Sequence, residues 1–112
     1  MRKLFVAGIL LLLTNAALAN YECKGAVKYI GLGDSLYVNI GFGIHKLCTL
    51  AGDTSDQCNA WFALFLSAQA QGKDVGVSYR DSTGKISSDE TCSAIGHWVV
   101  PSDEVYFVNL YM

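Results

Sequence analysis

The chain has 112 residues and four cysteines, 52% of it is hydrophobic, and its formal net charge is −2. Because acidic residues outnumber basic ones, it lacks the basic surface that nucleic acids and anionic lipids bind, and neither is an expected partner. Its length predicts one domain. A domain this small hides only somewhat over ~60% of its unfolded surface, so covalent reinforcement is expected.

Residues 1–19 have the three parts of a secretory signal peptide in the expected order. Basic residues at 2–3 precede an apolar run at 4–13 and a small-residue cleavage site at 17–19. The apolar run is too short for a membrane-spanning helix, which needs about 20 residues. We therefore expect a secreted or periplasmic single domain, residues 20–112, with six Lys and Arg against ten Asp and Glu, a formal charge of −4.

Five short segments alternate apolar with polar residues, or are rich in β-branched and aromatic residues, as strands are. They cover residues 25–30, 36–40, 46–50, 75–80 and 105–112. Glycine pairs at 31 and 33 and at 41 and 43 predict turns, because glycine readily adopts a positive φ. Neither pair completes a GxGxxG or P-loop motif.

One helix is predicted between the third and fourth strands, over about residues 56–71. Cap-forming residues at 54–57 precede it and a glycine follows it, which are start and stop signals. Trp61, Phe62 and Phe65 follow helical spacing, so this aromatic face is expected to pack on the sheet.

The opposite face of this helix has no charged residue from 57 through 72. Small residues recur along it: Ala60, Ala63, Ser67 and Ala70. Two interpretations remain open. The face is either a weakly polar surface, exposed or covered by the protein's own loops, or a subunit contact in a homo-oligomer.

All four cysteines lie in the exported part, where thiols normally oxidise. They are Cys23, Cys48, Cys58 and Cys92. Four cysteines allow three pairings, and the residues alone do not choose among them. A zinc site with His45 and His97 is the alternative, but the chain has no CxxC pair, which a structural zinc motif usually supplies.

The order of three strands, a helix and two strands is the connectivity of the OB-fold, a small five-stranded Greek-key barrel. The residues that carry a resemblance are Cys23-Lys24-Gly25, Leu47-Cys48, Cys58-Asn59-Ala60-Trp61, residues 68–75, Ser78-Tyr79 and Cys92. Over nearly all of residues 20–112 this pattern resembles a group of short secreted bacterial proteins. More distantly it is similar to the B subunits of AB5 toxins, of the pertussis-like and subtilase types, which are OB-folds that bind cell-surface glycans as pentamers.

The resemblance implies a β-rich α+β domain: a five-stranded OB-fold-like barrel with one helix between strands three and four, stapled by disulfides. In the barrel order, Cys48 ends the third strand and Cys58 opens the helix, so these two are expected to pair. Cys23 and Cys92 would lie beyond opposite ends of the paired first and fourth strands, and form the second disulfide. The toxin likeness also implies a ring of subunits with a sugar pocket on the barrel side. No diagnostic sugar-contacting motif matches, so no binding residue is carried over.

Catalytic and metal chemistry have little support in the sequence. The acidic loop at 81–90 does not fit the spacing of an EF-hand, so calcium binding there is only a minor alternative, and the main prediction includes no metal or other cofactor. No nucleophile motif such as GxSxG is present. His45 and His97 are the candidate bases for the alternative function, a small secreted hydrolase.

The main prediction is therefore a secreted binding module that recognises a carbohydrate or a protein. Tyr37 and Trp98 are the chosen candidates for stacking on a ligand, from a set that also includes Tyr21, Tyr29 and Tyr106. Most Tyr and Trp side chains in a small β domain pack inside it, so only a few of these are expected to face a ligand.

Overall fold

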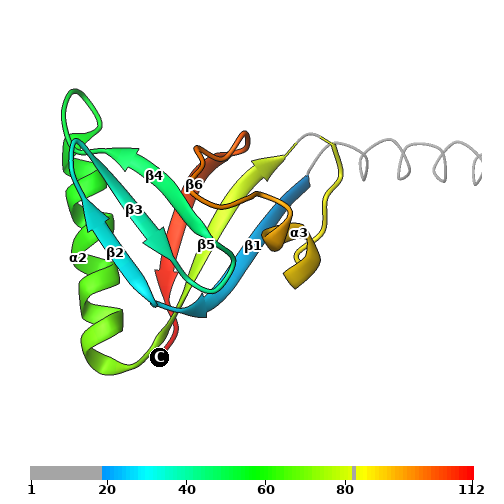
Figure 1. Ribbon diagram of the computed structural model, residues 1–112, viewed down its shortest axis with the longest axis horizontal. Coiled ribbons are helices and arrows are strands. Elements are labelled where there is room, and N and C mark those ends of the chain that lie inside the picture. The colour runs from blue at the N-terminus through cyan, green and yellow to red at the C-terminus, as the bar shows by residue number, and fades with distance from the viewer. Residues whose placement is uncertain (1–18, 82) are drawn as a thin grey trace, which may run out of the picture.

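The computed structural model describes residues 19–81 and 83–112, so the predicted signal peptide, 1–19, lies outside the described residues except for Ala19. The elements in chain order are β1 (Ala19–Ala26), β2 (Tyr29–Leu32), β3 (Ser35–Asn39), β4 (Ile44–Thr49), α2 (Ser55–Gln71), β5 (Asp74–Asp81), α3 (Asp89–Ser93) and β6 (Glu104–Leu110). Figure 1 shows α2 along one side of the molecule and α3 beside β1 on the other. Neither helix is long and apolar enough to cross a bilayer.

The strands form two separate antiparallel sheets of three strands each. One sheet has the order β1-β5-β6, and the other is the meander β2-β3-β4. In Figure 1 the strands of the two sheets run across each other. The predicted five-stranded OB-fold-like barrel is therefore wrong.

Two features of the chain explain why the barrel does not form. The first predicted strand, 25–30, is the junction of two strands: β1 ends at Ala26, and β2 begins at Tyr29 in the other sheet. The outer edge of β4 does not pair with β6 either. Residues 97–99 lie there instead, with an isolated bridge between His45 and Val99 and a 3.0 Å hydrogen bond from Lys46 N to Val99 O.

The core lies where the inner faces of the sheets meet α2. Leu36 from β3, Val77 from β5 and Phe65 from α2 are almost fully buried there, and Trp61 and Phe62 pack against it half-buried. The predicted helix is confirmed to within one residue. It ends where the sequence signal placed its stop, because the glycine after it adopts φ +65° and its N–H bonds to a carbonyl of the last turn.

Both predicted disulfides are present. Cys48–Cys58 joins β4 to the first turn of α2, and Cys23–Cys92 joins β1 to α3, across 69 residues of sequence. Cys23 lies within β1, not beyond its end as expected. Helix α3 was not predicted; it is only five residues long and is capped by the Ser88 hydroxyl.

Candidate binding site

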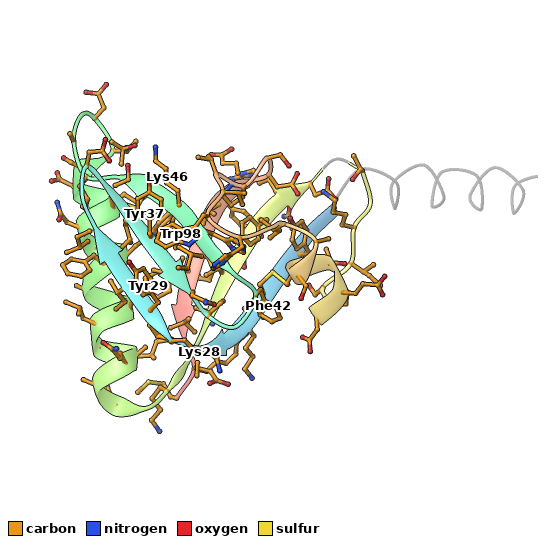
Figure 2. All side chains as sticks on the ribbon, in the orientation of Figure 1. Lys28, Tyr29, Tyr37, Phe42, Lys46 and Trp98 are labelled. Carbon is orange, nitrogen blue, oxygen red and sulfur yellow. A yellow bond between two sulfur atoms is a disulfide. The ribbon has the colours of Figure 1, made fainter. Side chains whose placement is uncertain are left out.

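Three aromatic side chains meet on the outer face of the β2-β3-β4 sheet. The ring centroid of Trp98 lies 5.9 Å from that of Tyr29 and 6.1 Å from that of Tyr37. Figure 2 shows the three residues, here named the aromatic cluster, side by side over the sheet. The structure thus brings together Tyr37 and Trp98, the two stacking residues chosen from sequence, and adds Tyr29.

The strand pattern places both tyrosines on this face. Leu36 and Val38 are buried, so Tyr37 between them points outward. Gly31 lies opposite Tyr37 in the pairing of β2 with β3. A Cβ atom at Gly31 would lie 2.9 Å from the Tyr29 ring, so the missing side chain leaves room for that ring to lie along its own strand. Gly31 therefore belongs to the site. It does not form the turn that was predicted from the glycine pair at 31 and 33.

Trp98 comes from residues 96–99, here named the Trp98 loop, which is fastened along the outer edge of β4. Trp98 N donates to Ile44 O at 2.8 Å, and Ile44 N donates to His97 Nδ1 at 2.9 Å. The loop also passes close over Gly43, where a Cβ atom would lie 2.4 Å from Gly96 O. Contacts on both sides of Trp98 therefore fix its position on the sheet.

The backbone of Trp98 is strained and its side chain is exposed. Its φ is +59°, and no other described residue except glycine has a positive φ. This left-handed conformation costs a non-glycine residue about 1–2 kcal/mol. The side chain is nevertheless 59% exposed, so the free protein gains little apolar burial in return. Strain kept by its surroundings at an exposed aromatic residue is typical of functional sites.

The two histidines considered as catalytic bases both serve the Trp98 loop. His97 accepts a backbone N–H, as described above. His45 is buried, its Nε2 lies 2.9 Å from Gly96 O, and its Nδ1 lies 3.4 Å from the Tyr79 hydroxyl. Burial lowers the pKa of His45, because a charged ring would lose its hydration. The hydrogen bonds of the described residues pair neither histidine with a carboxylate.

Two lysines mark the ends of the aromatic cluster. Lys46 is paired with Tyr37 across β3 and β4, and Lys28 lies at the opposite end, near Phe42 (Figure 2). Strands β2, β3 and β4 contain no Asp or Glu. In an otherwise acidic chain, this face therefore offers amine donors beside aromatic rings.

The other tyrosines considered from sequence have partners within the protein. Tyr21 is buried and stacks on Tyr79, with ring centroids 5.2 Å apart. The guanidinium of Arg80 lies over Tyr106, 4.5 Å from its ring centroid. In the sequence these residues look the same as Tyr29 and Tyr37, because all are tyrosines in or near strands.

A hollow of about 410 Å³ lies at the other end of the molecule, between α3 and the loop before it. It is lined by Lys85, Ile86, Ser88, Glu90, Thr91 and Ala94, and none of these is aromatic. It is a rival location for a ligand.

In the loop at 81–90, a lysine lies between two carboxylates. Lys85 Nζ is 2.8 Å from Asp103 and 4.0 Å from Asp81. Asp81 also accepts hydrogen bonds from Thr83 and from the backbone of Lys85. Over residues 19–81 and 83–112, no three His, Cys, Asp or Glu side chains gather as metal ligands would.

The small-residue face of α2 faces outward. Ala60, Ala63 and Ala70 are exposed, and Ser67 is half-buried and accepts a hydrogen bond from Gln71. Subunit contact through this face stays a prediction.

Comparisons with protein-family models, curated proteins and solved structures found no match. The resemblance to toxin B subunits therefore has no support from them, and function must be inferred from the site.

Proposed function

We propose that this protein is a secreted binding module that holds a saccharide against the aromatic cluster. The observation that carries the proposal is Trp98, which is strained, exposed and fixed by backbone contacts between two tyrosines. A buried Trp would stabilise the fold through its area. This one contributes far less to the core, and its arrangement is explained by a partner outside the chain.

The chemistry of the aromatic cluster fits a sugar ring. A pyranose presents a face of C–H groups, which packs on the electron-rich face of an aromatic ring, and a rim of hydroxyls, which needs hydrogen-bond partners. Lys46 and Lys28 supply amine donors at the ends of the cluster, and the tyrosine hydroxyls both donate and accept. Ligand sites commonly combine apolar area with a few polar groups in this way.

The disulfides support the same proposal. Two disulfides in a domain of this size are compatible with an extracellular or periplasmic location, where thiols oxidise. A saccharide at a cell surface or in the periplasm is available to a protein in either place.

The first test is binding of the exported protein to a glycan array, followed by calorimetry on the saccharides that it retains. Trp98→Ala should weaken binding by roughly 30-fold or more, as loss of a central aromatic contact does. The matched control is Ile86→Ala, which removes another exposed apolar side chain, 73% exposed, from the hollow beside α3. If Ile86→Ala weakens binding and Trp98→Ala does not, the ligand occupies the hollow. If a protein ligand binds and no glycan does, the proposal that the ligand is a saccharide is wrong.

A second pair of variants tests the cluster without deleting a ring. Gly31→Ala should displace the Tyr29 ring and weaken binding, because the new Cβ atom would lie 2.9 Å from it. Gly33→Ala is the control, since a Cβ atom there meets nothing within 4 Å. Equal affinity of the two variants would argue against a role for Tyr29.

The alternative function, a hydrolase with a histidine base, is not favoured by any contact described here. Both histidines are occupied by the backbone of the Trp98 loop or of β4. Saccharide turnover abolished by His97→Ala, with the fold intact, would favour the hydrolase.

A further inference from the structure

One of the hydrogen bonds that fasten the Trp98 loop to β4 requires a neutral histidine. Ile44 N–H donates to His97 Nδ1 at 2.9 Å. A backbone N–H can only donate, so Nδ1 carries the lone pair and the ring proton is on Nε2. Protonation of His97 would place a second N–H on Nδ1, directed at the first. This bond would then become a contact between two donors, beside the backbone bond from Trp98 N to Ile44 O.

His97 is accessible to solvent protons, since its side chain is exposed. The bond that it makes also lies next to Trp98, whose ring centroid is 5.9 Å from that of His97. Loss of this bond therefore acts directly on the strained residue that completes the aromatic cluster.

His45 adds a loss of overall stability in acid. Its Nε2 lies 2.9 Å from Gly96 O, at the start of the loop. Burial lowers the pKa of His45; backbone hydrogen bonds with Gly96 and Phe42 offset part of this, the nearby His97 lowers the pKa further, and the net direction is down. In the unfolded chain this ring takes up a proton near pH ~6.5, and in the folded protein only at lower pH. As the pH falls below ~6.5 the unfolded state therefore binds more protons, and the folded state loses stability.

Few charged groups oppose this effect. Within the described residues, the titratable groups that face His45 are His97 from the loop and Tyr79 from β5. Burial raises the pKa of the Tyr79 hydroxyl, and the nearby Asp103 acts in the same direction, so Tyr79 stays neutral over the acid range. Lys46 follows His45 on β4, and its side chain is on the opposite, outer face.

We propose that the Trp98 loop is an acid-sensitive latch, which completes the aromatic cluster while His97 is neutral and releases it when His97 is protonated. The proposal deepens the binding function and rests on it for its biological meaning: a saccharide is held near neutral pH and released in acid. The movement of the loop itself needs no ligand and can be measured without one.

The first measurement is amide NMR of the free exported protein between about pH 7.5 and about pH 5. The Ile44 and Trp98 amide signals should shift together, and their hydrogen exchange, corrected for the intrinsic effect of pH, should accelerate. The buried Val77 amide of β5 is the control for general unfolding and should stay protected. Ile44 and Trp98 amides that keep their shifts and protection across this range overturn the latch.

The second measurement is affinity at the same two pH values for the array glycan that the wild type retains most strongly. The affinity of the wild type should fall roughly tenfold on acidification, because the Ile44 N–H then loses its acceptor. His97→Asn keeps an acceptor near the Nδ1 position but does not titrate, so its affinity should change much less with pH. His97→Ala has no acceptor and should show a mobile Ile44 amide at both pH values.

The two proposals fail in different ways. If His97→Asn loses as much affinity in acid as the wild type, the latch is wrong even though the saccharide binds. If no glycan binds at neutral pH, the binding function is wrong, and the amide measurement alone decides the latch.

Discussion

At the scale of the residue, the site depends on the backbone conformation of one residue and on the missing side chain of another. Trp98 occupies a backbone conformation suited to glycine, and Gly31 leaves the space that the Tyr29 ring fills. The aromatic residues could be named from the sequence. Their contact in the folded protein could not be predicted. Trp98 reaches the sheet through a loop distant in sequence, and no residue near it in the sequence predicts a positive φ.

A pair of variants at Trp98 measures the strain separately from the ring. Trp98→Gly and Trp98→Ala both remove the indole, but only glycine adopts φ +59° without steric cost. In urea denaturation, Trp98→Gly should have a free energy of unfolding higher than Trp98→Ala by about 1 kcal/mol. Both should lose saccharide binding. An alanine variant as stable as the glycine variant would show that position 98 is not strained.

At the scale of the element, the edge of β4 decides both the fold and the site. The Trp98 loop takes the hydrogen-bonding positions that another strand would need to close a barrel, and in doing so it places Trp98 over Tyr37. An open sheet edge invites further pairing. Here the covering loop occupies that edge and carries a residue of the site.

The turn between β3 and β4 offers a matched test of this docking. Gly41 and Gly43 have nearly the same φ, +111° and +110°. A Cβ atom at Gly43 would lie 2.4 Å from Gly96 O, whereas at Gly41 the nearest atom is the Lys28 side chain at 3.7 Å. Both alanine variants should be destabilised by backbone strain. The free energy of unfolding should fall further for Gly43→Ala than for Gly41→Ala, by at least about 1 kcal/mol. Thermal melts that coincide would show that the loop does not need this close approach.

Elements with strong local signals were predicted well. Helix α2 has caps, a glycine stop and a periodic aromatic face, and β5 alternates cleanly, so both were placed to within about one residue. The start of β1 was missed because Glu22 to Lys24 does not read as a strand without its partner β5. Helix α3 was missed because its five residues lie in a polar loop, and a disulfide holds it.

At the scale of the whole molecule, two disulfides join elements of a domain too small to bury much surface. Cys48–Cys58 closes a short loop, and Cys23–Cys92 closes a long one. The pairing was predicted correctly although the barrel used to choose it was wrong. The prediction needed only that Cys48 and Cys58 flank a short connection, which holds in either architecture.

The two disulfides should differ in their contribution to stability. If chain entropy dominates, replacing Cys23 and Cys92 by alanine should cost about 4 kcal/mol, and replacing Cys48 and Cys58 about 3 kcal/mol. Denaturant unfolding of the two double variants measures the difference. A larger loss for the short loop would show that contacts around the β4–α2 connection outweigh loop entropy.

The central claim is that the aromatic cluster holds a saccharide, and an NMR titration of the exported protein with a glycan retained on the array tests it most directly. The Trp98 indole and the Tyr29 and Tyr37 ring signals should shift in a saturable manner, while the Ile86 and Thr91 signals beside α3 stay fixed. Saturable shifts confined to Ile86 and Thr91, with an unchanged Trp98 indole, would contradict the claim.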